Sequence, residues 1–403
     1  MVGQVVYRYE FAPFDLGSSL NLERNRKKIK TTARDLGWVD ASEHFAGRDI
    51  SHIIPNHVAL LEADDVLVYI PESGFGVARY RFEHRGGTSD DVVADALLAR
   101  REFQKEIDEG SFEQNAVDSN TRVAFLVATL REELQRGNNP EKRLLIPHKN
   151  LHFYSLSVFA VPDHLPDWLG WCLLQPRALG CSVSTDQPPT REALGEAIKG
   201  CRDAELTLTE IQEDIAAADG VFSSWSAVLV DATAMNDNLD LVTLCEFRVQ
   251  STWYAANCAS EIAALSPETS NLNRRRMMIR LSQSAFERTR WLTERRLGAN
   301  DPEKPKQILD QISATSDVQR EVENAEAALS QALAHAELEI ERRSAYGRKL
   351  LQVFSLIFAS AGLAQVMLPL PITSEVFQEH LLAILIWLGM TLLGAVLVIR
   401  QER

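Results

Sequence analysis

The most uneven charge feature of the sequence is a run of arginines. Arg274, Arg275 and Arg276 follow one another, and Arg280 comes one helical turn later. Guanidinium groups bind phosphates and carboxylates through paired hydrogen bonds, so this run predicts a site for a small anionic or nucleotide ligand. The alternative is a solvated helix face whose arginines pair with the acidic helix downstream. The sequence leaves both interpretations open.

Other candidate chemistry is weaker. His52 and His57, with Asp49, Asp64 and Asp65 nearby, do not match a metal-ligand spacing, and surface histidines are the favoured interpretation. The sequence contains no G-x-S-x-G, Walker A or H-E-x-x-H signature and no Cys–His pair at a catalytic spacing. We therefore expect no enzyme activity.

One helical segment carries Glu246, Arg248, Gln250, Trp253 and Tyr254. These residue types bind ligands in many proteins. Packing inside the protein is nevertheless the favoured interpretation, because polar and aromatic residues of this kind also occur in helix cores.

Charge and cysteine content exclude two classes of protein. The net charge of −14 argues against broad nucleic-acid binding, which needs a basic surface. The five cysteines are widely spaced and form no C-x-x-C pair, which predicts reduced, buried thiols and neither a disulfide framework nor a zinc site.

Two segments near the C-terminus, 350–370 and 381–399, contain no ionisable side chain. About 20 apolar residues are needed to cross a bilayer, so the sequence predicts a two-helix transmembrane hairpin, with a pair of buried core helices as the alternative. Basic residues flank the pair, whereas the loop between the segments carries only Glu375 and Glu379. The positive-inside rule then predicts a multi-pass protein of the cell inner membrane with both termini cytoplasmic.

A long helix is expected before the first apolar segment, because no proline or glycine interrupts the chain between Lys306 and Tyr346. We expect a stalk helix over 306–349 that continues into 350–370. Its apolar positions have near-heptad spacing, which indicates packing against other helices, including copies of itself, or against its own domain. These positions are Val318, Val322, Ala325, Leu329, Ala332, Ala336 and Ile340.

A stripe of small and polar residues continues a similar spacing into the apolar segment, where such residues indicate helix–helix contact. A ring of several copies would place this stripe around a pore. The stripe comprises Gln352, Ser355, Ala359, Gly362 and Val366.

The N-terminal part alternates strand and helix patterns without a regular βαβ rhythm, which predicts an α+β fold with a mixed sheet. We expect strands near 5–11, 65–70, 77–82, 143–146, 152–161 and 227–231, and helices over 90–107, 121–135 and 192–217. The Ser73–Gly76 segment is predicted to be a hairpin turn. The predicted organisation is a cytoplasmic α/β domain over 1–235, a helical region over 236–300, the stalk and the hairpin.

This plan resembles the CorA family of divalent-cation channels, and the similarity is greatest from about Leu239 to Arg403. The resemblance implies a homo-pentameric funnel with a possible divalent-cation ligand. Gln352, Ser355, Ala359, Gly362 and Val366 would then line the pore, and Glu375 and Glu379 would attract cations at its external mouth. The family's Gly-Met-Asn signature is absent, because the corresponding position reads Gln365-Val366-Met367.

Two functions follow as hypotheses. The first is a homo-oligomeric ion channel or transporter gated by its cytoplasmic domain. The second is a membrane effector of the antiviral type, whose soluble domain binds a signal such as a nucleotide second messenger. CorA-like proteins that lack the signature include effectors of this kind.

Overall fold

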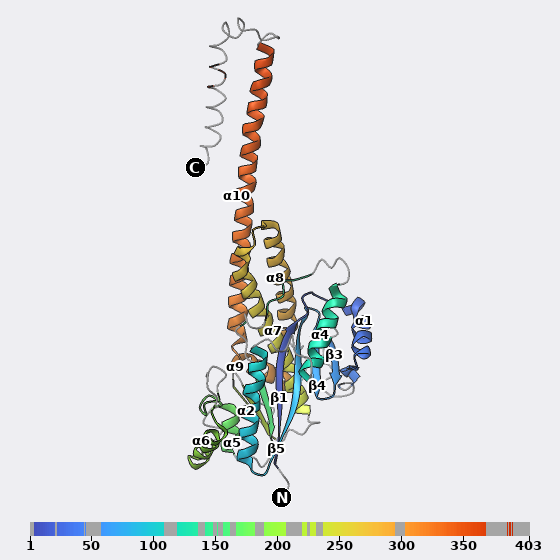
Figure 1. The fold of residues 1–403 in the computed structure, drawn as a ribbon, viewed down its shortest axis with the longest axis vertical. Helices are drawn as coiled ribbons and strands as arrows, with labels where there is room; N and C mark the ends of the chain where they lie inside the picture. The colour runs from blue at the N-terminus through green and yellow to red at the C-terminus, as the bar shows by residue number, and fades with distance from the viewer. Residues whose placement is uncertain are drawn as a thin grey trace. The chain divides into compact units, whose positions relative to one another are not determined.

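The computed structural model describes most of the chain, and its described part divides into two compact units. The first unit contains residues 1–269 and 277–332, and the second contains 270–276 and the described residues from 333 onward. Figure 1 shows the elements along the chain. The structure describes residues 4–20, 22–43, 45, 58–108, 119–135, 142–147, 151, 156–161, 167–181, 189–206, 220–223, 226–230, 237–294, 303–367, 385, 387 and 389.

An eight-stranded mixed sheet forms the centre of the first unit, with the order β2-β3-β4-β5-β1-β6-β8-β7. Only β6 and β8 pair in parallel among these strands, and the other pairs are antiparallel. The predicted mixed sheet is confirmed. The strands are β1 (Gln4–Asp15), β2 (Val39–Asp40), β3 (Val58–Ala63), β4 (Val66–Pro71), β5 (Phe75–Gly86), β6 (Leu156–Val161), β7 (Gly220–Phe222) and β8 (Ser226–Val230).

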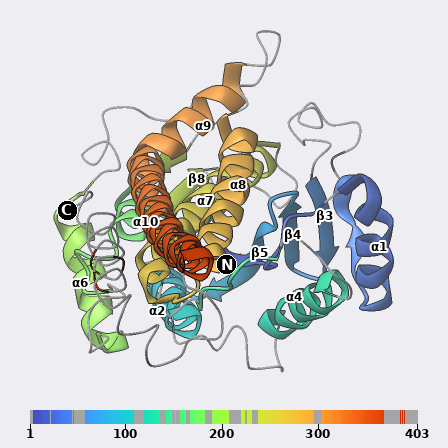
Figure 2. The ribbon, with the colours of Figure 1, turned by 90° about the horizontal axis from the view of Figure 1, so that it is seen from above.

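The central strand β1 is buried on both faces, because Val6 and Phe14 on one face and Tyr9 and Phe11 on the other are at most 1% exposed. Successive side chains of a strand point to opposite faces, so helices must cover both sides of the sheet. Figure 2 shows α1 (Leu22–Asp35) and α4 (Ser119–Gln135) beside β3 and β4. The first unit is therefore a layered α/β structure.

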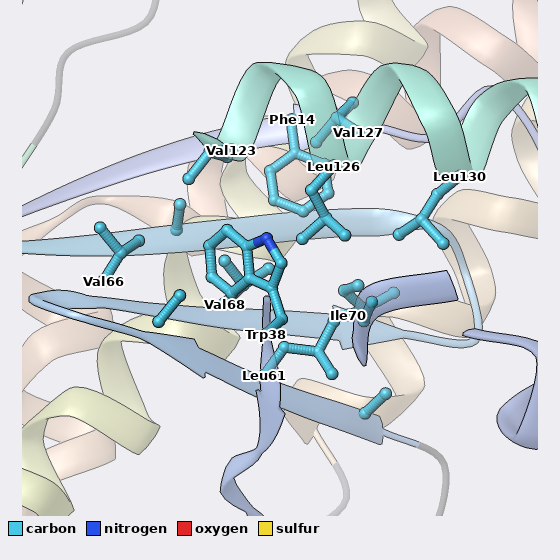
Figure 3. Close-up of a cluster of buried hydrophobic side chains, with 14 of the residues drawn as sticks. Phe14, Trp38, Leu61, Val66, Val68, Ile70, Val123, Leu126, Val127 and Leu130 are labelled. Carbon is cyan, nitrogen blue, oxygen red and sulfur yellow. The ribbon is translucent and has the colours of Figure 1, made fainter. Parts of the chain in front are cut away.

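The face that carries Val6 and Phe14 has two apolar clusters. The first joins β3, β4 and β5 to α1 and α4 around Trp38, which is 2% exposed, and Figure 3 shows Trp38 among these side chains. The second lies under α2 (Ser89–Asp108), α5 (Asp167–Leu174) and α6 (Arg191–Asp203). These clusters hold the helical layer on this face of the sheet.

Helix α7 (Asp237–Leu265) covers the opposite face. The Phe247 ring stacks on Tyr69 of β4 with centroids 5.3 Å apart, and it meets Phe11 of β1 edge-on. Ser251 Oγ donates a hydrogen bond of 2.7 Å to the Phe75 carbonyl. Nearly every residue of α7 from Leu239 to Ala259 is buried, which makes it a core helix covered on all sides.

Three further helices follow, α8 (Leu272–Glu294), α9 (Glu303–Thr315) and α10 (Val318–Met367). The chain turns between α9 and α10 at Asp317, whose φ is +53°. Asp adopts this left-handed conformation more readily than most residues, so the helix ends without proline or glycine. The continuous helix of 50 residues that follows is about 75 Å long.

Five of the seven predicted heptad positions of α10 are covered by the chain itself, and the other two, Ala332 and Ile340, are half-buried. Val318, Val322, Ala325 and Leu329 are at most 5% exposed within the first unit. The near-heptad spacing therefore correctly predicted a buried face. Of the two partners expected for that face, other helices or the chain's own domain, the structure shows the chain's own domain. In the second unit, Ala336 is buried too.

The predicted transmembrane hairpin needs correction. Among the described residues, no helix combines the length and the apolar character needed to cross a bilayer. Side chains of the first apolar segment are described only over 350–359, about half of the roughly 20 residues that a span requires. Apart from residues 385, 387 and 389, the second segment lies outside the described residues. The inner-membrane, multi-pass assignment and the fold class that included the hairpin are corrected with it.

Candidate functional site

The second half of α10 exposes large apolar side chains. Tyr346 is 68% exposed, Leu351 67% and Phe358 74%, while Leu350 and Phe354 are 41% and 50% exposed. Ile357, 41% exposed, lies on the same side of the helix, and Leu356, 38% exposed, lies on another side. At 3.6 residues per turn, Tyr346, Leu350, Leu351, Phe354 and Phe358 cover an arc of about 140° on the helix. We call them the α10 apolar stripe. Such a contiguous patch on a protein surface usually marks a contact with another molecule.

The residues predicted to line a pore lie on another side of the same helix. Gln352, Ser355 and Ala359 are exposed and fall within about 60° of one another, outside the apolar stripe. Gly362 and Val366 belong to α10, but their side chains lie outside the described residues. The two glutamates predicted at the pore mouth, Glu375 and Glu379, also lie outside the described residues.

The arginine run at the start of α8 points in several directions. Arg275 is buried, and its Nη1 donates to Glu339 Oε2 over 3.1 Å while its Nη2 lies 3.2 Å from His335 Nδ1. Arg274 and Arg280 are exposed, and Arg276 is half-buried. Arg275 is joined to α10 by its ion pair with Glu339. Anion binding by the run stays a prediction.

A second arginine of α8, Arg290, forms an ion pair with Glu326 of α10 within the first unit. Together with the Arg275–Glu339 pair, this contact matches the interpretation in which basic α8 pairs with acidic α10. Both pairs are partly exposed, so each contributes little to stability by itself.

The least expected feature is a buried ionic network on β1, which we call the β1 network. Arg8 Nη1 donates to Glu10 Oε1 over 2.7 Å, and Ser157 Oγ lies 2.8 Å from each Glu10 carboxylate oxygen. Arg100 of α2 is 8% exposed and donates to Ser226 Oγ over 2.8 Å. Arg8, Glu10, Ser157 and Ser226 lie on the adjacent strands β1, β6 and β8, and Arg100 reaches them from α2.

Burial dominates the electrostatics of the β1 network. Burial raises the pKa of the Glu10 carboxyl, and the charges of Arg8 and Arg100 oppose that shift. Arg8 Nε donates to His84 Nε2 over 3.2 Å, and burial together with the Arg8 charge lowers the pKa of His84 to about 4. The imidazole is therefore neutral at physiological pH and accepts a hydrogen bond from a permanent cation.

Sequence patterns did not identify this network. The segment around Arg8 and Glu10 alternates polar and apolar residues, which is typical of a strand with one solvated face. The weak signal was Arg100 and Gln104, which lie one helical turn apart on α2, both buried. Only the tertiary structure shows that α2 covers the polar face of β1.

The polar residues singled out on α7 are mostly buried. Glu246, Arg248, Gln250 and Tyr254 are between 1% and 6% exposed, and Trp253 is half-buried. Tyr254 packs edge-on against Phe75 with ring centroids 6.2 Å apart. Their burial supports the packing interpretation over an open ligand site.

Metal ligands and relatives give no further assignment. Among the described residues, no three His, Cys, Asp or Glu side chains form a group that would hold a metal ion. His52, His57 and Asp49 lie outside the described residues. The five cysteines are free and buried. Comparison of the chain with protein-family models, with curated proteins and with solved structures finds no match.

Proposed function

We propose that this protein works as a homo-oligomer whose copies associate through the α10 apolar stripe. The observation that carries the proposal is the exposure of Tyr346, Leu351 and Phe358, each more than two-thirds exposed on a regular helix. Aromatic side chains are enriched at protein interfaces and often anchor them, so an exposed stripe that carries three of them indicates a contact surface.

The exposed area is large enough to matter. The three aromatic side chains, Tyr346, Phe354 and Phe358, together leave on the order of 400 Å² in water, from their exposed fractions and the usual size of aromatic side chains. Leu350 and Leu351 add to this surface. The largest apolar patch of a typical monomer is about 300–600 Å², so the stripe alone reaches that range.

The free energy gained by covering the stripe is comparable with the free-energy cost of association. Covering about 400 Å² of apolar surface is worth roughly 10 kcal/mol, against an association cost of about 4–15 kcal/mol. One neighbouring helix covers an apolar stripe of about 100°, whereas this stripe spans about 140°. Two neighbours per helix cover the stripe better than one, which favours a ring of copies over a simple pair.

The partner is a second copy of the same helix. Tyr346, Leu350, Phe354 and Phe358 repeat every four residues, so they form a ridge that can enter the groove of an identical helix. Most of the heptad positions earlier in α10 are already covered by the chain itself, which leaves this later part of the helix for other copies.

The resemblance to the CorA family and the two functions derived from the sequence stay predictions. Ion conduction would require a ring of several copies, and a signal-triggered effector could use the same assembly. Both of these functions therefore depend on self-association of the chain. The identity of any signal, anion or cation is a separate question from assembly.

The direct test is the mass of the assembled protein by native mass spectrometry and sedimentation velocity. The wild-type chain should appear at multiples of its 45.1 kDa mass. The double variant Leu351→Glu/Phe358→Glu should be monomeric, because it would bury two unpaired carboxylates at each interface. Phe125→Glu on α4 is the matched control, because Phe125 is 59% exposed outside the stripe, and it should keep the wild-type mass. A monomeric wild-type protein at tens of micromolar would contradict the proposal.

A further inference from the structure

Helix α7 buries a carboxyl group that has no basic partner among the described residues. Glu246 is 1% exposed, and its described hydrogen-bond partner is Gln250 on the next turn, whose Nε2 lies 3.5 Å from Glu246 Oε2. A carboxylate is an acceptor with two oxygens that need several donors. One long hydrogen bond does not satisfy it, so ionised Glu246 would be costly at this place.

The amide of Gln250 has the complementary deficit. This residue is 4% exposed, and its Oε1 has no donor among the described residues. A protonated carboxyl group has one O–H donor and one carbonyl acceptor, and a primary amide has the same pair of functions in reverse. The two groups can therefore satisfy each other only if Glu246 carries the proton.

The charged groups around α7 do not remove this requirement. On the sheet side, Arg79 donates to Thr243 Oγ1 and lies over the Tyr9 ring. The positive charge of Arg248 opposes the rise in the pKa of Tyr69 that burial causes. On α9, Lys306 and Asp310 are exposed. Cys245, next to Glu246 in the chain, donates through Sγ to the Pro305 carbonyl. Burial raises the pKa of Glu246 to about 8, and the hydrogen bond from Gln250 opposes this rise.

We propose that Glu246 is protonated in the folded protein at neutral pH and shares two reciprocal hydrogen bonds with Gln250, which couples the packing of α7 to pH. The Glu246 O–H donates to Gln250 Oε1, and Gln250 Nε2–H donates to the Glu246 carbonyl oxygen. Because α7 covers the sheet over β1, β4 and β5, loss of this proton loosens the central layer contact of the first unit.

The sign of the pH dependence follows from linkage. An unfolded glutamate has a pKa near 4.5, so unfolding releases the Glu246 proton between about pH 4.5 and about pH 8. The stabilisation is fully present below pH 4.5, falls as pH rises and is gone above pH 8. Within that window the unfolding equilibrium constant rises tenfold for each pH unit through this group.

The test compares the full chain with its Glu246→Gln variant, which has the shape of the protonated acid but no proton to lose. Unfolding in urea is measured at pH 5.5, 6.5 and 7.5, and the ratio of the wild-type to the variant unfolding constant is followed. This ratio should rise about a hundredfold over the two pH units. Glu341→Gln, an exposed glutamate on α10, is the control and should give a flat ratio.

A ratio that stays constant within twofold across the range would overturn the proposal. Infrared spectroscopy gives a second readout that does not depend on the stability of the variant. The wild-type protein at pH 7 should show the carbonyl band of a protonated carboxyl group, and this band should fade as the pH is raised through 8. Absence of the band in folded protein at pH 7 would also refute the assignment.

Discussion

Removing the carboxylate of the β1 network should destabilise the first unit strongly. In Glu10→Leu, Arg8 loses its 2.7 Å ion pair and Ser157 loses both of its acceptors. The guanidinium groups of Arg8 and Arg100, 2% and 8% exposed, then remain buried without this anion. Breaking a buried pair by removing one partner typically costs about 3–5 kcal/mol, and we expect a loss in that range.

That loss is a large part of the stability of an ordinary domain, which is about 5–15 kcal/mol. The assay is urea unfolding followed by circular dichroism and tryptophan fluorescence. Asp95→Leu on α2 is the control, because the Arg191–Asp95 pair is largely exposed, and it should change stability by less than about 1 kcal/mol. Glu10→Gln should cost less than Glu10→Leu, because the amide oxygen still accepts hydrogen bonds.

A double-mutant cycle separates pairing from packing. Arg8→Met/Glu10→Leu removes both partners, so its cost should be clearly smaller than the sum of the two single costs. A loss below about 1 kcal/mol for Glu10→Leu, or strict additivity in the cycle, would refute the reasoning that this pair is held by desolvated charge.

Two further changes test the same unit. Trp38→Ala should cost about 3–5 kcal/mol in urea unfolding, because Trp38 is 2% exposed at the centre of the cluster under α4 and its loss leaves a cavity; a cost under 1 kcal/mol would contradict this packing. His84 is kept neutral beside Arg8, so its contribution to stability is present above pH 6.5 and is lost as pH falls toward about 4. His84→Gln should therefore show a shallower loss of stability on acidification, and equal acid profiles for variant and wild type would contradict the assigned contact.

Sequence periodicity identified elements with strong patterns. The alternation around Val5–Phe11 correctly predicted β1, although the strand runs from Gln4 to Asp15. The Ser73–Gly76 turn is also confirmed, with Gly74 at a φ of +82° between β4 and β5. These signals are local, because they depend on side-chain alternation and on the conformational freedom of glycine.

Other elements have no clear local signal. Helix α1 is strongly polar, and only Ile29 and Ala33 are buried among its described side chains, so its pattern was too weak to predict. Strand β3 was missed too. The break at Asp317 was missed because it contains neither proline nor glycine.

The candidate site was predictable only in part. The spacing of Val318, Val322, Ala325 and Leu329 showed that one face of α10 is buried, but a heptad pattern does not say whether the partner is the same chain or another copy. The β1 network could not be inferred, since the helix that covers Arg8 and Glu10 lies far away in the sequence. Whether a polar face of a strand is exposed to solvent depends on the tertiary structure, which the local sequence pattern does not show.

The central claim is that copies of the chain meet along α10, and disulfide trapping tests it most directly. All five native cysteines are buried, so Leu351→Cys, at a position 67% exposed, would supply the reactive thiol. Mild oxidation of this variant should give a covalent dimer at twice the chain mass, whereas Met277→Cys, at a position 56% exposed on α8, should give little. Equal and slow cross-linking of both variants would contradict self-association through the α10 apolar stripe.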